Sequence, residues 1–102
     1  MVISRMKIRW SRRALDDQDE GLAYIAHFNP EAAHRLRLSI EEGLEHIRAF
    51  PNASRAVPEA GNPCIREVLR EPFRVMYQVC PRELRILAVR SMERAAMDER
   101  DF

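Results

Sequence analysis

Residues 64–90, CIREVLREPFRVMYQVCPRELRILAVR, decide the fold of this chain of 102 residues. Two short turns, one at Pro72 and one at Pro81, divide the stretch into three segments. Proline cannot donate a ladder hydrogen bond and pre-sets φ for a reversal, so each segment between the turns is expected to be extended. The stretch therefore predicts three consecutive antiparallel strands, over residues 64–70, 73–79 and 84–90.

The middle and last segments differ in their periodicity. The middle one alternates, as in a half-buried strand, with Phe73, Val75, Tyr77 and Val79 on one face and Arg74, Met76 and Gln78 on the other. In the last segment Leu84, Ile86 and Ala88 alternate with Arg85, Leu87 and Val89, so both faces carry apolar residues. That pattern indicates a strand that is covered on both sides or that lies near a partner.

Two helices are expected before the strands. Ser11 is a suitable N-cap for a helix over residues 12–28, and Asn29 caps a second helix, with Pro30 at its first position, that runs to about residue 50. Apolar residues recur at helical spacing: Leu15, Leu22, Ile25 and Ala26 in the first helix, and Ala33, Leu36, Ile40, Leu44 and Ile47 in the second. Because the connection is short, the helices should pack as an antiparallel hairpin.

A short strand over residues 6–10 and a loop over residues 52–63 complete the chain. The order is β-α-α-β-β-β, which predicts an α+β fold with the helical hairpin packed on one face of a small, mostly antiparallel sheet. We expect one domain over residues 1–102, with flexible or extended ends at 1–5 and 92–102.

Composition excludes some functions. The 17 basic residues, of which only Lys7 is a lysine, nearly balance 16 acidic ones, for a net charge of +1. A protein that grips a nucleic-acid backbone usually has a basic excess, so non-specific nucleic-acid binding is disfavoured unless the arginines are concentrated on one face. No apolar run is long enough to span a membrane, and the N-terminus lacks the apolar core of a signal peptide, so we expect a cytoplasmic protein.

The cysteines and histidines give no sign of a cofactor. Cys64 and Cys80 lie at the far ends of one expected hairpin, so a disulfide is geometrically conceivable, but two buried thiols in a reducing cytosol are favoured. The three histidines lack metal-ligand spacing with these cysteines. We expect no metal and no cofactor.

Several ordered segments carry a family resemblance. They are WSRRALDD at residues 10–17, YIA at 24–26, NPEAA at 29–33, IRAFPNASR at 47–55, IREV at 65–68, FRVMYQV at 73–79 and LRILAVR at 84–90. With them, residues 6–94 resemble the ParE/RelE family of toxins from bacterial type II toxin–antitoxin pairs. The resemblance implies that a cognate antitoxin, ParD-like for a ParE-type toxin, wraps the chain in a hetero-oligomer. It implies contact with operator DNA only through that antitoxin.

The resemblance leaves two activities. RelE-type members cleave messenger RNA on the ribosome, and ParE-type members are associated with poisoning DNA gyrase. The ParE-like branch is favoured, because Ser91 stands about where RelE-like enzymes often have a histidine and no tyrosine follows Tyr77. A third reading is a non-toxic member that only forms a regulatory complex.

Candidate residues follow for each reading. If the chain is an RNase, which would make it an enzyme, the base, acid and phosphate-binding cations would come from Arg66, Glu67, Arg74, Tyr77, Arg90 and Arg94. For gyrase, the candidate target-binding residues are Met92, Glu93, Arg94 and Met97. For the antitoxin, whose arm we expect to be acidic, they are Leu38, Arg55, Met76 and Leu87.

A structural reading of the same residues is also open. Arg66 and Glu67 fit cross-strand ion pairs with Arg74 or Arg85, and Tyr77 shares its face with apolar residues, as a core aromatic would.

Overall fold

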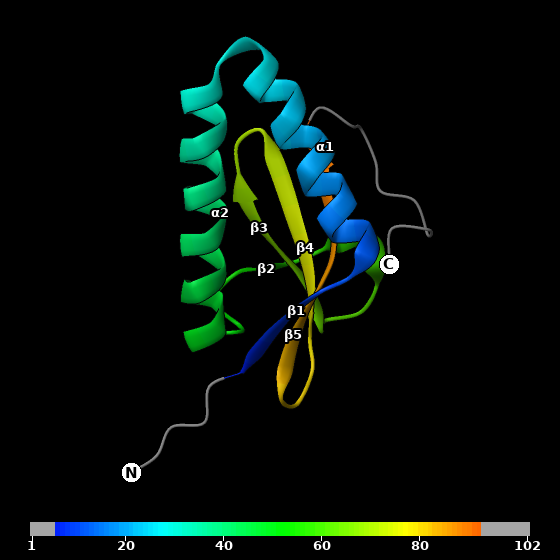
Figure 1. The fold of residues 1–102 in the computed structure, drawn as a ribbon. Helices are drawn as coiled ribbons and strands as arrows, with labels where there is room; N and C mark the ends of the chain where they lie inside the picture. Colours follow the sequence, from blue (N-terminus) through cyan, green and yellow to red (C-terminus); the bar gives the residue numbers. More distant parts are fainter. Residues whose placement is uncertain (1–5, 93–102) are drawn as a thin grey trace.

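The fold is a helical hairpin packed on a mixed five-stranded sheet, as the computed structural model of residues 6–92 shows (Figure 1). The expected α+β class is therefore confirmed. The elements are β1 (Lys7–Trp10), α1 (Arg12–Phe28), α2 (Pro30–Ala49), β2 (Arg55–Ala56), the 3₁₀ helix η1 (Pro58–Ala60), β3 (Ile65–Arg70), β4 (Phe73–Val79) and β5 (Glu83–Ser91).

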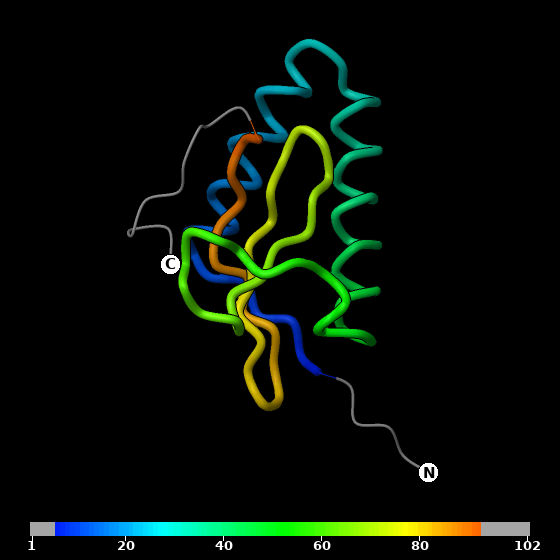
Figure 2. Tube along the Cα trace, turned by 180° about the vertical axis from the view of Figure 1, so that it is seen from behind, coloured from blue at the N-terminus to red at the C-terminus, as the bar shows by residue number. Residues whose placement is uncertain are grey.

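The strands lie in the order β1-β5-β4-β3-β2. β1 runs parallel to β5, and the other neighbouring pairs are antiparallel, so the predicted three-stranded meander forms the centre of the sheet. The helices cover one face. Residues 51–63, which we call the strap, cross the opposite face, as Figure 2 shows from behind.

Both helices begin at the predicted caps. Ala14 donates its backbone N–H to the Ser11 hydroxyl at 3.0 Å, and Ala32 donates to the Asn29 side chain at 3.1 Å. These bonds satisfy amide groups that a helix N-terminus otherwise leaves without a partner. One position was predicted wrongly: Leu15 is 38% exposed, since Ala14 and Gln18 take the buried positions on α1.

The core has two parts. Between hairpin and sheet, the predicted stripe of α2 packs on the apolar face of β4, which includes Phe73, Val75 and Tyr77. Beneath the strap lies a smaller cluster of Val57, Ile65, Met76 and Ala88. Met76 is 0% exposed, so its predicted role as an exposed contact was wrong: the strap, read as a simple loop, covers it.

A bulge in β5 changes which side chains face the helices. Met76 pairs with Ala88 but Tyr77 pairs with Ile86, which leaves Leu87 as the additional residue. Ala88 consequently packs on the strap side and Val89 on the helix side. The expectation that Leu84, Ile86 and Ala88 share one face was therefore wrong at Ala88.

The bulge also anchors α1 to the sheet. Ser11 donates its hydroxyl to the Leu87 carbonyl at 3.2 Å and its amide to the Ile86 carbonyl at 3.0 Å. One turn into the helix, an Asp17 carboxylate oxygen accepts the Val89 amide at 3.0 Å. The start of α1 is thus fixed to the point where β5 is irregular.

Both cysteines are free thiols. Cys64 is exposed and Cys80 half-buried, so the expectation of two buried thiols was wrong. Within residues 6–92, no three His, Cys, Asp or Glu side chains are grouped closely enough to hold a metal ion. No helix in this part of the chain is long and apolar enough to cross a membrane.

Candidate functional site

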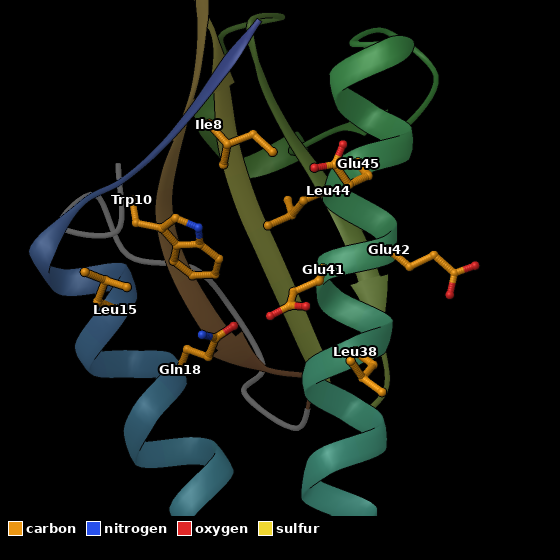
Figure 3. A pocket seen from close by; sticks show the side chains of 9 residues that line it. All are labelled: Ile8, Trp10, Leu15, Gln18, Leu38, Glu41, Glu42, Leu44 and Glu45. Atoms are coloured by element: carbon orange, nitrogen blue, oxygen red, sulfur yellow. The ribbon is translucent and has the colours of Figure 1, made fainter. Parts of the chain in front are cut away.

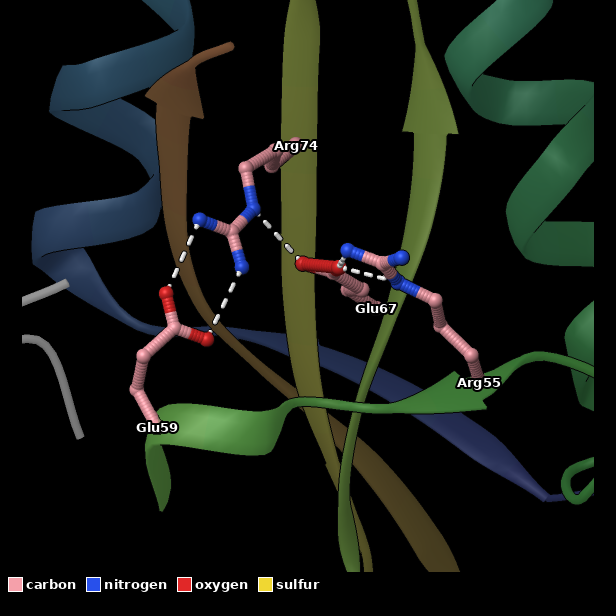
Figure 4. Close-up of polar contacts among 4 residues, drawn as sticks. All are labelled: Arg55, Glu59, Glu67 and Arg74. Carbon is pink, nitrogen blue, oxygen red and sulfur yellow. Dashed lines mark hydrogen bonds and ion pairs between the residues drawn. The ribbon is translucent and has the colours of Figure 1, made fainter. Parts of the chain in front are cut away.

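Four charged residues form an alternating ion-pair network on the strap side of the sheet (Figure 4). Glu67 lies at its centre, and its side chain is 0% exposed. One Glu67 carboxylate oxygen accepts Arg55 Nε at 2.7 Å, and the other accepts Arg74 Nε at 2.7 Å. Arg74 reaches on to Glu59, with Nη1 and Nη2 at 3.3 and 3.4 Å from its two oxygens.

The strands and the strap place these groups together. Arg55 on β2 lies directly opposite Glu67 on β3, and η1 carries Glu59 across to Arg74 on β4. Burial alone would lower the pKa of Arg74, but its bonds to Glu67 and Glu59 and their charges raise that pKa above the ordinary value. Arg74 is therefore held as a cation, and the network fastens the strap to the sheet.

Arg66 and Tyr77 hold the first residues of the strap, and Arg66 also reaches its last residue, Pro63. Arg66 donates to the Ser54 carbonyl at 2.9 Å, to the Pro63 carbonyl at 3.2 Å and to the Asn52 carbonyl at 3.3 Å. The Tyr77 hydroxyl is hydrogen-bonded to the Ser54 hydroxyl and donates to the Pro51 carbonyl at 3.2 Å.

Burial raises the pKa of Tyr77, although the Ser54 hydrogen bond and the Arg66 charge act in the opposite direction. The phenol is therefore held in its neutral form.

Four of the six nuclease candidates thus serve as attachments of the strap, but the structure does not bring them together at one site: Glu67 and Arg74 belong to the strap-side network, whereas Tyr77 lies in the helix-side core with Arg66 opposite it on β3. The predicted pair of Glu67 with Arg74 is confirmed, whereas Arg85 pairs with Glu83 at 2.7 Å. Tyr77 is a buried aromatic, as the structural reading predicted. Arg90 lies opposite Arg74 on β5, and Arg94 lies outside the described residues.

The antitoxin candidates do not form one surface. Leu38 is 49% exposed on α2, Arg55 belongs to the network, Met76 is buried and Leu87 is half-buried at the bulge. Of the target-binding candidates, Met92 is 38% exposed at the end of β5, and Glu93, Arg94 and Met97 lie outside the described residues.

A groove of about 500 Å³ opens between α1, α2 and β1 (Figure 3). Ile8, Trp10 and Leu44 supply apolar surface, and Leu15 and Leu38 stand on the two helices. Sequence reasoning identified Leu38 but missed the glutamates that line the groove with it, Glu41, Glu42 and Glu45. Their signal was the spacing of three and then four from Leu38 to Glu41 and Glu45, which places these three on one side of a helix.

Comparisons with known proteins agree with this architecture. Residues 8–96 match the model of the "ParE toxin of type II toxin-antitoxin system, parDE". A Sinorhizobium fredii protein named "Putative toxin Y4kP" is 38% identical over 53 residues, which are 52% of this chain and 55% of that protein. The chain thus spans about half the length of this relative.

A solved structure described as "Chromosomal ParDE TA system from P. aeruginosa" shares the fold. It superimposes on this chain with a TM-score of 0.68 at 25% sequence identity. The matched region covers 84% of this chain and 95% of the solved chain. This chain belongs to the ParE toxin family of type II toxin–antitoxin systems.

Proposed function

We propose that the protein is a cytoplasmic toxin that binds DNA gyrase and blocks DNA replication, and that a ParD-like antitoxin neutralises it. One observation favours inhibition of gyrase over cleavage of RNA. Four of the six side chains with which this sequence would build an RNase site, Arg66, Glu67, Arg74 and Tyr77, are occupied in fastening the strap.

Cleavage of RNA by its own 2′-hydroxyl needs a base, an acid and cations that reach the reacting phosphate. Glu67 is buried, with an arginine on each carboxylate oxygen, and the Tyr77 hydroxyl is held by Ser54 and Pro51. Freeing Glu67 would break a buried ion pair, which costs roughly 3–5 kcal/mol when one partner is removed. A toxin that acts by binding its target needs no such rearrangement.

The charge balance supports the same choice. A protein that docks on ribosomal RNA gains affinity by neutralising phosphates with lysine and arginine. This chain has a net charge of only +1, and Arg55 and Arg74 are already paired with carboxylates. The charge of these two arginines is thus offset within the protein and adds little to attraction for RNA.

Neutralisation by an antitoxin is supported by the family, which is described by its pairing in parDE systems. An exposed leucine at position 38 beside an apolar groove is typical of a surface that a partner covers. We propose a hetero-oligomer in which the antitoxin also makes the contacts with operator DNA.

The proposal is tested by inducing this chain alone and following thymidine and methionine incorporation together. We expect DNA synthesis to fail first and translation to follow. If translation fails first, the chain is ribosome-directed and Arg66, Arg74, Tyr77 and Arg90 become the catalytic suspects. If neither fails, the chain is a non-toxic member that only forms a complex.

The target-binding surface has its own test. Met92 is exposed where β5 ends, and the candidates Glu93, Arg94 and Met97 follow it in sequence. We expect deletion of residues 92–102 to abolish toxicity while antitoxin affinity is retained. Continued growth arrest by the shortened chain would place the target surface elsewhere.

A further inference from the structure

We infer that the groove between α1, α2 and β1 takes a helical segment of the antitoxin whose apolar face is bordered by lysine or arginine residues four positions apart. This inference rests on the proposed neutralisation by an antitoxin. It differs from the acidic arm that the arginine-rich sequence suggested, because the charge that lines the groove is negative.

The groove offers apolar area that remains in contact with solvent. Leu38 on α2 is 49% exposed and Leu15 on α1 is 38% exposed, although both are large apolar side chains. Ile8 and Trp10 of β1 line the same groove and pack against the core (Figure 3). An amphipathic helix buries its apolar face in such a groove through residues at spacings of three and four.

The charged residues that line the groove are all acidic. Glu41, Glu42 and Glu45 come from α2, and within the described part of the chain no lysine or arginine lines the groove. Arg48 bonds to Glu45 at 2.7 Å and offsets part of its charge. Figure 3 shows Glu41 reaching toward Gln18 of α1, whereas Glu42 points away from the groove.

The spacing of the glutamates indicates the spacing of the partner's cations. Glu41 and Glu45 are four residues apart, which is about 6 Å along a helix axis. A partner helix that lies beside α2 places its own residues i and i+4 at the same interval. Lysine or arginine at those two positions would meet both carboxylates, whereas glutamate there would be repelled.

The experiment uses two synthetic amphipathic peptides with identical leucine positions, one with lysine and one with glutamate at two flanking positions four residues apart. Trp10, the only tryptophan of the chain, lines the groove, so its fluorescence reports occupancy. We expect the lysine peptide to bind about tenfold more tightly, which corresponds to about 1.4 kcal/mol, and to lose affinity as salt is raised.

Charge reversal provides the decisive variants. Combined Glu41→Lys and Glu45→Lys should reverse the preference between the peptides. Combined Asp19→Lys and Glu71→Lys, a matched change of two exposed residues that do not line the groove, should leave it unchanged. Equal binding of the two peptides, or binding of neither, would overturn the inference.

The cognate antitoxin separates failure of this inference from failure of the proposed function. If the antitoxin binds the chain but the Glu41→Lys and Glu45→Lys variant binds it with unchanged affinity, the groove assignment is wrong and neutralisation stands. If the chain binds no antitoxin at all, both fail.

Discussion

Replacing Glu67 by glutamine tests whether the ion-pair network is structural. Glu67 is completely buried and carries the only charge between Arg55 and Arg74 in the network. The amide can accept from one arginine through its oxygen, but its NH₂ group would face the other arginine, donor against donor. The strap would lose its central attachment.

The size of the expected loss in stability depends on which partners Arg55 and Arg74 retain after the substitution. Removing one partner of a buried ion pair costs roughly 3–5 kcal/mol. Arg74 retains Glu59 at 3.3 Å, and the Arg55 side chain is already 61% exposed, so water can solvate its charge. We therefore expect the lower end, about 3 kcal/mol of the free energy of unfolding, out of a total of roughly 5–15 kcal/mol for a single domain.

Urea denaturation followed by circular dichroism measures this loss. Asp16→Asn removes the exposed pair of Asp16 with Arg12, 3.4 Å apart, and should leave the midpoint within error of the parent protein. A Glu67→Gln midpoint equal to that of the control would refute the structural role. Lost toxicity with an unchanged midpoint would instead indicate a catalytic carboxylate.

Three further predictions concern the core and the groove. Burial raises the pKa of Tyr77 above its ordinary value near 10. The neutral phenol therefore contributes fully to the free energy of unfolding below about pH 10, and this contribution is lost as pH rises through the folded-state pKa. Urea titrations at pH 8 and 11 should show that Tyr77→Phe lacks this alkaline loss. Leu38→Gln leaves the charge of the groove unchanged and should weaken antitoxin binding about tenfold, as measured by calorimetry, since burying a leucine contributes roughly 1.5–3 kcal/mol. Unchanged affinity would show that α2 is not part of the interface. Both Gly43→Ala and Gly21→Ala gain helix propensity, but they differ in what the new Cβ would meet. At Gly43 it would lie 2.9 Å from the guanidinium end of Arg70, a flexible side chain that can shift, so the melting temperature should rise. At Gly21 it would lie 2.5 Å from the ring of Phe73 in the buried core, so the melting temperature should fall; equal shifts would contradict this packing.

The helices and central strands could be predicted because their signals are local. Ser11 and Asn29 cap helices through bonds to residues three positions on, and Phe73, Val75 and Tyr77 alternate within one strand. A signal contained within a few residues remains readable without the rest of the chain.

The strap and the bulge could not be predicted because both depend on distant partners. Met76 is buried against Val57, which the strap brings across the sheet from 19 positions earlier in the chain, next to the pairing of Arg55 with Glu67. Ala88 changes face because Leu87 is left over in the pairing with β4. The groove likewise joins residues of β1, α1 and α2 that share no motif.

The central claim is that this chain inhibits gyrase by binding it, without cleaving RNA. The most direct measurement adds the purified chain to DNA gyrase and relaxed plasmid, with and without the antitoxin, and in parallel to a translating ribosome with labelled messenger RNA. We predict that supercoiling is inhibited in proportion to the added chain, that the antitoxin restores it, and that the messenger RNA stays intact. Cleaved messenger RNA with unaffected supercoiling would contradict the account.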